Sequence, residues 1–163
     1  MTSLDELRLL IVDAADMAWQ PPSHILRRIA ALLRGEPAVF VDRQNNGHTG
    51  DIFVLTPSRV ILASFTDAAP VEQHALHERA SVEVDTWRRV DLCKIAVDSD
   101  GEEGWNSDYA WQQSKGDTWP EGARVTLTYQ GQAPLCLPLQ QYPHRAHRAA
   151  MHSIMDELLA DLR

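Results

Sequence analysis

Few cysteines, few basic residues and no long apolar run mark this chain of 163 residues, and each shortage excludes a class of protein. Its two cysteines, Cys93 and Cys136, are too few for a disulfide framework at this length. Both lie in apolar strand patterns, so we expect buried free thiols, with a disulfide bond as the alternative if their strands are neighbours. No apolar run approaches the roughly 20 residues that a membrane-spanning helix needs. The first residues lack the basic start and apolar run of a signal peptide, which favours a cytoplasmic protein.

Basic residues are outnumbered by acidic ones. The sequence has 15 Lys and Arg against 23 Asp and Glu, and its formal net charge is -8. A chain this acidic gains nothing overall from releasing counterions on DNA or RNA, and an anionic membrane surface repels it on average. We therefore expect no nucleic-acid partner.

Catalytic and metal-binding motifs are also missing. No Gly-x-Ser-x-Gly, P-loop or Gly-x-Gly-x-x-Gly pattern occurs, so we expect neither an enzyme nor a cofactor. Two His-x-x-His pairs, His74 with His77 and His144 with His147, could each share one face of a helix. The informative His-Glu-x-x-His zinc pattern is absent, however, and His147 falls on an apolar helix stripe, where a hydrogen-bonded core histidine is expected. The acidic turn at 98–104 does not match a calcium-binding loop either, so no metal site is predicted.

The spacing of apolar residues predicts an α+β protein. Residues 37–65 predict three antiparallel strands joined by turns at Asn45-Asn46-Gly47 and at Thr56-Pro57-Ser58-Arg59. A capping box at Ser3 and Glu6 and apolar residues three or four apart predict a first helix. The predicted helices cover 4–19, 24–34 and 143–162. Ser23 is expected to cap the second helix, and Gly35 to end it. The predicted strands cover 38–41, 52–55, 60–63, 81–85, 87–97 after an initial turn, 107–113, 124–129 and 134–138.

The order of these segments resembles the bacterial pleckstrin-homology-like (PH-like) domains. Residues 53–61, FVLTPSRVI, resemble the family's strand-turn-strand signature, and residues 87–97 resemble its later strand-loop unit. The hairpin at 124–138 and the helix after it are similar to the family's last hairpin and closing helix. The resemblance implies a partly open antiparallel barrel of about seven strands, closed by the C-terminal amphipathic helix. Residues 1–35 would then be a helical extension packed on a PH-like domain at 36–163.

Two features bear on what such a domain would bind. PH-like domains that bind phosphoinositides usually carry several Lys and Arg in the first hairpin loop, whereas the matching loop, 43–51, offers one Arg. We therefore expect no specific phosphoinositide binding. A long acidic segment carries Trp105, Tyr109, Trp111 and Trp119, which is typical of a protein-binding surface, although these rings could instead cover a barrel face.

The sequence thus predicts a protein-interaction or self-association domain. Two alternatives stay open: a small-molecule-binding barrel, and an acidic dimeric protein similar to secretion chaperones. A helix at 70–78 would favour the second alternative.

Overall fold

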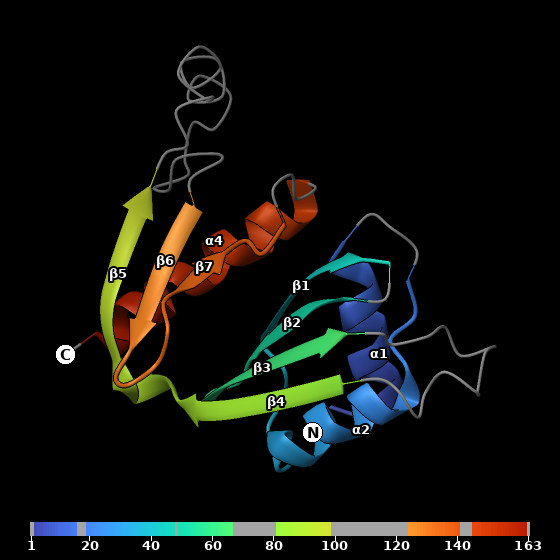
Figure 1. Cartoon of the computed structure of the whole chain (residues 1–163). Helices are drawn as coiled ribbons and strands as arrows, with labels where there is room; N and C mark the ends of the chain where they lie inside the picture. Colours follow the sequence, from blue (N-terminus) through green and yellow to red (C-terminus); the bar gives the residue numbers. More distant parts are fainter. Residues whose placement is uncertain are drawn as a thin grey trace. The chain divides into compact units, whose positions relative to one another are not determined.

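The computed structural model shows an α+β protein with three α-helices and two antiparallel sheets in the part that it describes (Figure 1). The described residues are 2–15, 19–47, 49–66, 81–98, 124–140 and 145–162. They fall into two compact units, one formed by residues 1–89 and 139–144, the other by residues 90–138 and 145–163. Predicted segments at 70–78 and 107–113 lie outside the described residues.

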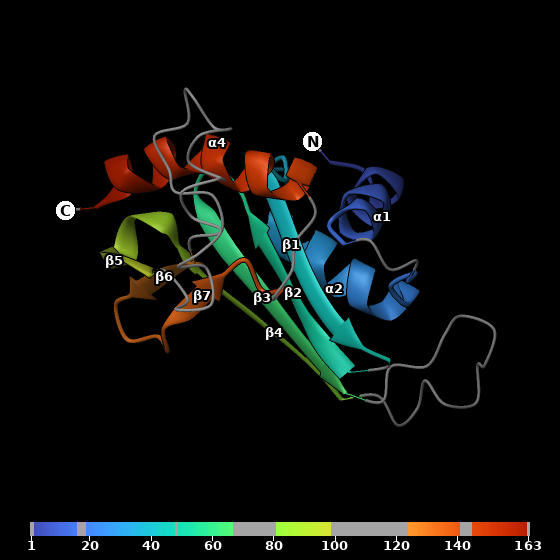
Figure 2. The same cartoon turned by 90° about the horizontal axis from the view of Figure 1, so that it is seen from above.

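The first unit is a four-stranded antiparallel sheet with two helices on one of its faces, as Figures 1 and 2 show. Its strand order is β1-β2-β3-β4. The elements are α1 (Leu4–Asp13), α2 (Ser23–Leu33), β1 (Phe40–Asn46), β2 (Thr49–Leu55), β3 (Arg59–Thr66) and β4 (Ser81–Arg88). Each strand pairs with the next along the chain, as the sequence predicted for the first three.

Strict alternation gives this sheet two different faces. Ile52 and Val54 of β2 point to the helices and join the core that α1 and α2 complete. Phe53 and Leu55 point to the opposite face and are also fully buried. On that face Phe53 meets Phe40 edge to face, with ring centroids 6.2 Å apart. Because residues 52–55 of β2 are buried on both faces, this part of the strand is a continuous apolar run.

Several predicted boundaries needed correction. Helix α1 ends at Asp13, not at residue 19, and Ser23 is the first residue of α2 rather than its cap, because Pro22 takes the cap position without a side-chain hydrogen bond. The first hairpin turns at Gly47, with φ of 62°, while Asn45 and Asn46 still belong to β1. The turn at 56–59 was predicted correctly, and the Thr56 N–H donates to the Arg59 carbonyl at 2.9 Å.

The second unit holds the three-stranded antiparallel sheet β5-β6-β7 and helix α4. The two units meet along the chain at a short 3-10 helix, η2 (Arg89–Asp91), of which Arg89 belongs to the first unit. The remaining elements of the second unit are β5 (Leu92–Asp98), β6 (Arg124–Tyr129), β7 (Leu135–Leu137) and α4 (Arg145–Asp161). The predicted apolar stripe of the last helix is buried at His147, Met151, Ile154, Met155 and Leu158, but its last member, Leu162, lies beyond the end of α4 and is only partly buried.

Both cysteines are free, but the prediction that both are buried was wrong. Cys93 on β5 is exposed and Cys136 on β7 is partly exposed. Strand β6 lies between their strands, so the condition for a disulfide bond, neighbouring strands, is not met.

Candidate functional site

The four aromatic residues predicted to bind a partner, Trp105, Tyr109, Trp111 and Trp119, lie outside the described residues. The same holds for three of the four paired histidines, His74, His77 and His144. The fourth, His147, is 5% exposed, which confirms that it is a buried helix residue. Across the described ranges, no group of three or more His, Cys, Asp or Glu side chains is placed to hold a metal ion. The search for a site therefore turns to the first unit.

Helix α1 carries two different apolar stripes. Leu7, Ile11 and Ala14 are buried against α2 and the sheet. The second stripe holds Leu9 and Leu10, which are 61% and 40% exposed. A helix of ten residues does not usually present leucines to water on the side opposite its core, so this stripe is a candidate contact surface.

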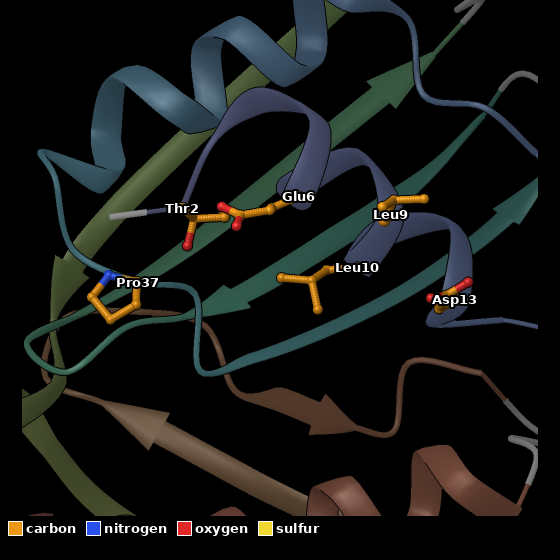
Figure 3. A pocket seen from close by; sticks show the side chains of 6 residues that line it. All are labelled: Thr2, Glu6, Leu9, Leu10, Asp13 and Pro37. Atoms are coloured by element: carbon orange, nitrogen blue, oxygen red, sulfur yellow. The ribbon is translucent and has the colours of Figure 1, made fainter.

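An open groove of about 440 Å³ runs beside the second stripe. Its lining comes from α1, from the residue Thr2 before it and from the chain between α2 and β1, namely Thr2, Glu6, Leu9, Leu10, Asp13 and Pro37. Figure 3 shows Thr2 and Glu6 towards one end, Asp13 at the other, and Leu10 between them, facing the segment that holds Pro37. The α1 residues recur at i, i+3, i+4 and i+7, so they form one continuous stripe along the helix.

The groove has an apolar floor and an acidic border. Glu6 stands in the first turn of α1, where its side chain accepts a hydrogen bond from the Ser3 N–H at 2.6 Å. This bond lowers the pKa of Glu6 most, and a hydrogen bond with the Ser3 side chain lowers it further, so the carboxylate is charged at neutral pH. Asp13 supplies a second carboxylate about two helical turns further on. None of the six described residues that line the groove is basic.

The N-terminal end of the groove is held by two contacts between backbone and side chain. The Ala38 N–H donates to the Thr2 hydroxyl at 2.9 Å, which ties the start of the chain to the segment before β1. Ser3 and Glu6 form the predicted capping box, with the Glu6 N–H donating to the Ser3 hydroxyl at 3.2 Å. Both walls of the groove are therefore fixed relative to each other at this end.

The C-terminal end of α1 is held by Arg43, a residue of β1 that is 1% exposed. Its guanidinium donates to the carbonyls of Ile11 at 2.6 Å and Val12 at 3.2 Å, and more weakly to Ala15 at 3.5 Å. The last carbonyls of a helix lack intrahelical donors and carry the negative end of its dipole, so a cation is well placed there. Arg43 also donates to the Asn45 side chain.

An aromatic pair completes the setting of Arg43. Its guanidinium lies 5.4 Å from the centroid of the Trp19 ring, within the range of a cation–π contact. Trp19 in turn stacks on Phe65 of β3, with centroids 5.2 Å apart and planes 5° from parallel. Arg43 is thus a buried structural cation of β1, not a residue of the hairpin loop as the sequence predicted.

A second polar cluster fastens the end of α2 to the β2–β3 turn. The Glu36 carboxylate accepts hydrogen bonds from the Ser58 hydroxyl at 2.5 Å, the Thr56 hydroxyl at 2.7 Å and the Ser58 N–H at 3.0 Å. It also pairs with Arg59 at 3.2 Å. The bond from the Ser58 hydroxyl, followed by that from Thr56, lowers the pKa of Glu36 to about 2. Every polar group in this cluster serves the turn, so we assign it to structure.

A buried carboxylate, Asp42, ties a distant segment to the first unit. It accepts the Leu139 N–H at 2.6 Å and the Arg43 N–H at 2.8 Å, and it is 0% exposed. The next residue, Gln140, donates through its amide to the Ala14 carbonyl at 2.6 Å. Asp42 therefore has a positioning role in the fold, whereas the groove beside α1 is open to a ligand.

Sequence reasoning missed this groove because it followed only the buried stripe of α1. The available signal was the pair Leu9-Leu10 lying off that stripe, between two acidic positions at 6 and 13. Comparison of the chain with protein-family models, with curated proteins and with solved structures found no match. Within its described residues, no helix is both long and apolar enough to cross a lipid bilayer.

Proposed function

We propose that this chain is a non-enzymatic protein-interaction domain with a PH-like fold, and that the groove beside α1 is its contact surface. The observation that carries the proposal is the exposure of Leu9 and Leu10 on a helix whose other face is fully packed. Burying two such leucines in a partner contributes roughly 1.5–3 kcal/mol each, less the part that the groove already covers. The antiparallel strands β1 to β7 and the closing position of α4 in the chain support the PH-like part of the proposal.

The groove favours a protein ligand over a small molecule. It is open along its length, and its polar groups stand at the border rather than converging on one point (Figure 3). Pockets for small ligands are usually enclosed and bury most of the ligand. A helix at 70–78 would favour the rival chaperone-like interpretation, but these residues lie outside the described part of the chain.

The test is the double variant Leu9→Ser with Leu10→Ser, compared with Leu159→Ser as a matched control. Leu159 is also a helix leucine and is 44% exposed, but it lies in the second unit. We expect the double variant to keep the thermal stability of the parent and to lose association, measured as solution mass by light scattering and as partner recovery by affinity capture. Equal association by the parent, the control and the double variant would contradict the proposal.

The tryptophan-rich segment is a second candidate surface for the same function. Trp111→Ala and Trp119→Ala should each be measured for thermal stability and for association in the same assays. Unchanged stability with lost association would place the contact there, whereas lost stability with unchanged association would make the rings structural.

We expect no specific binding of phosphoinositide headgroups. The guanidinium of Arg43 is buried and donates to carbonyls of α1, so it cannot also contact a phosphate. Liposome flotation that showed headgroup-dependent binding tighter than about 10 µM, roughly -7 kcal/mol, would contradict this expectation.

A further inference from the structure

We propose that the groove beside α1 takes an amphipathic helix of a different protein, one that presents a leucine-type apolar stripe flanked by Lys and Arg. The inference rests on the proposed function and goes further by naming the chemistry and the secondary structure of the partner. Three features of the groove carry it: the backbone of its second wall, its charge, and its rigidity.

The second wall comes from Pro37, and the segment that begins with it, residues 37–39, cannot pair with an extended strand through its N–H groups. Pro37 has no N–H, the Ala38 N–H donates to the Thr2 hydroxyl, and the Val39 N–H donates to the Leu55 carbonyl at 2.8 Å. A strand added to a sheet edge needs free main-chain donors and acceptors in register. The contact must therefore come from side chains, and a helix that lays an apolar stripe into the groove provides that kind of contact.

The charge at the border selects a basic partner. Glu6 and Asp13 stand about two helical turns apart on the side of the groove that the partner would cover. Lys or Arg residues flanking the apolar stripe of an incoming helix would lie opposite these carboxylates. A membrane surface rich in anionic lipids would instead be repelled by them.

The same charge argues against a second copy of this chain. A symmetric dimer through the groove would place the same patch on both sides, so Glu6 and Asp13 of one copy would face the same carboxylates of the other. The chain has a net charge of -8, which adds to the repulsion between copies. A partner with basic residues avoids both costs.

The groove is held in shape before any partner binds. Thr2 and Ala38 fix one end, the Ser3 and Glu6 capping box fixes the start of α1, and Arg43 holds its last carbonyls. A surface that needs no reordering loses little conformational entropy on binding, so a short helix can bind measurably.

The experiment uses the full chain and three labelled peptides of 16 residues that share one helical leucine stripe. The polar positions hold Lys in the first peptide, Gln in the second and Glu in the third, and binding is followed by fluorescence anisotropy. We expect the Lys peptide to bind about tenfold more tightly than the Gln peptide, with the difference shrinking at high salt, and the Glu peptide not to bind. A fourth peptide with the same Lys content and scattered leucines should not bind.

Two sets of variants link the binding to the groove. Leu9→Ser with Leu10→Ser should weaken the Lys peptide at least roughly thirtyfold, since two buried leucines are lost. Glu6→Gln with Asp13→Asn should remove most of the preference for Lys over Gln, and Gln at position 6 can still complete the capping box. Leu159→Ser should leave all affinities unchanged.

The outcomes separate this inference from the proposed function. Equal binding of the Lys and Glu peptides, or binding that ignores the leucine variant, would overturn the inference. Self-association of this chain, seen as a rise in solution mass with concentration that depends on Leu9 and Leu10, would also overturn the inference. The proposed function would stand in that case. Loss of all leucine-dependent association would overturn both.

Discussion

Helices α1 and α4 both bury one apolar stripe, yet they treat their remaining surface differently. Among the side chains of α4 that the structure describes, the exposed ones are alanine, serine and acidic residues and one leucine, Leu159. The ten residues of α1 expose three leucines, Leu4, Leu9 and Leu10. The exposed face of α4 is typical of a helix that only packs, whereas α1 combines a packing face with a face available for contact.

The two helices also differ in how their ends are satisfied. Neither has a basic residue of its own in its last turn. Helix α1 receives its cation from Arg43, 32 positions further along the chain than Ile11, whose carbonyl it binds. Helix α1, and with it the groove, is thus supported by a buried residue on a different element of the first unit.

The largest expected effects separate buried from exposed leucines on each helix. Leu7→Ala in α1 and Leu158→Ala in α4 should each lower the free energy of unfolding by about 2–5 kcal/mol, because both side chains are 0% exposed. Leu10→Ala and Leu159→Ala, at 40% and 44% exposure, should each cost less than about 0.5 kcal/mol. Urea unfolding measures all four. A small loss for Leu158→Ala would mean that the stripe of α4 does not stabilise the fold.

The second prediction tests whether the support of α1 comes from β1. Arg43→Met keeps much of the side-chain volume but leaves the Ile11 and Val12 carbonyls without their donor, so it should cost roughly 3 kcal/mol. Amide hydrogen exchange should speed up in the last turn of α1 and not in α4. Arg27→Met, at an exposed position of α2, is the control and should change stability by less than about 0.5 kcal/mol.

The third prediction concerns Glu36, which lies between α2 and Pro37 of the groove and binds the turn between β2 and β3. The pKa of Glu36 falls from 4.5 to about 2 in the folded chain, so its charge stabilises the fold above pH 4.5, and this contribution is lost as the pH falls through about 2. Glu36→Gln should cost about 1 kcal/mol at pH 7, after allowing for the partial exposure of the cluster. The difference from the parent should shrink as the pH falls below about 4.5, measured by thermal unfolding at a series of pH values. A difference that stayed constant with pH would show that the charge of Glu36 is not what matters.

The smallest stability effect belongs to the contact face itself. The double variant Leu9→Ser with Leu10→Ser should change the free energy of unfolding by less than about 0.5 kcal/mol, since neither residue is in the core. Circular dichroism and urea unfolding would check this next to the association assays. A loss as large as that of Leu7→Ala would mean that these leucines pack rather than bind, and the contrast between the two faces of α1 would disappear.

Much of the fold followed from local patterns. Alternation located β6 at its observed bounds, and the proline turn at 56–59 was predicted because Pro57 presets φ at its second position. The buried stripe of α4 followed from its three-four spacing. Predictions failed for the end of α1 and for the place of Arg43, where contacts between distant residues decide the outcome. The prediction for Cys93 failed because it assumed that both faces of β5 are covered.

The sequence by itself determined the helices, most strands and the class of the fold, because periodicity and turn chemistry act over a few neighbouring residues. It also determined the acidic charge that would bias the choice of partner. Spacing alone placed Leu9 and Leu10 off the buried stripe of α1, but only the tertiary structure showed that they line an open groove, because the other side of the groove comes from Pro37 in a distant segment of the chain. Tertiary structure likewise turned Arg43 from a hairpin residue into the support of α1, because the carbonyls that it binds are 31 and 32 positions away.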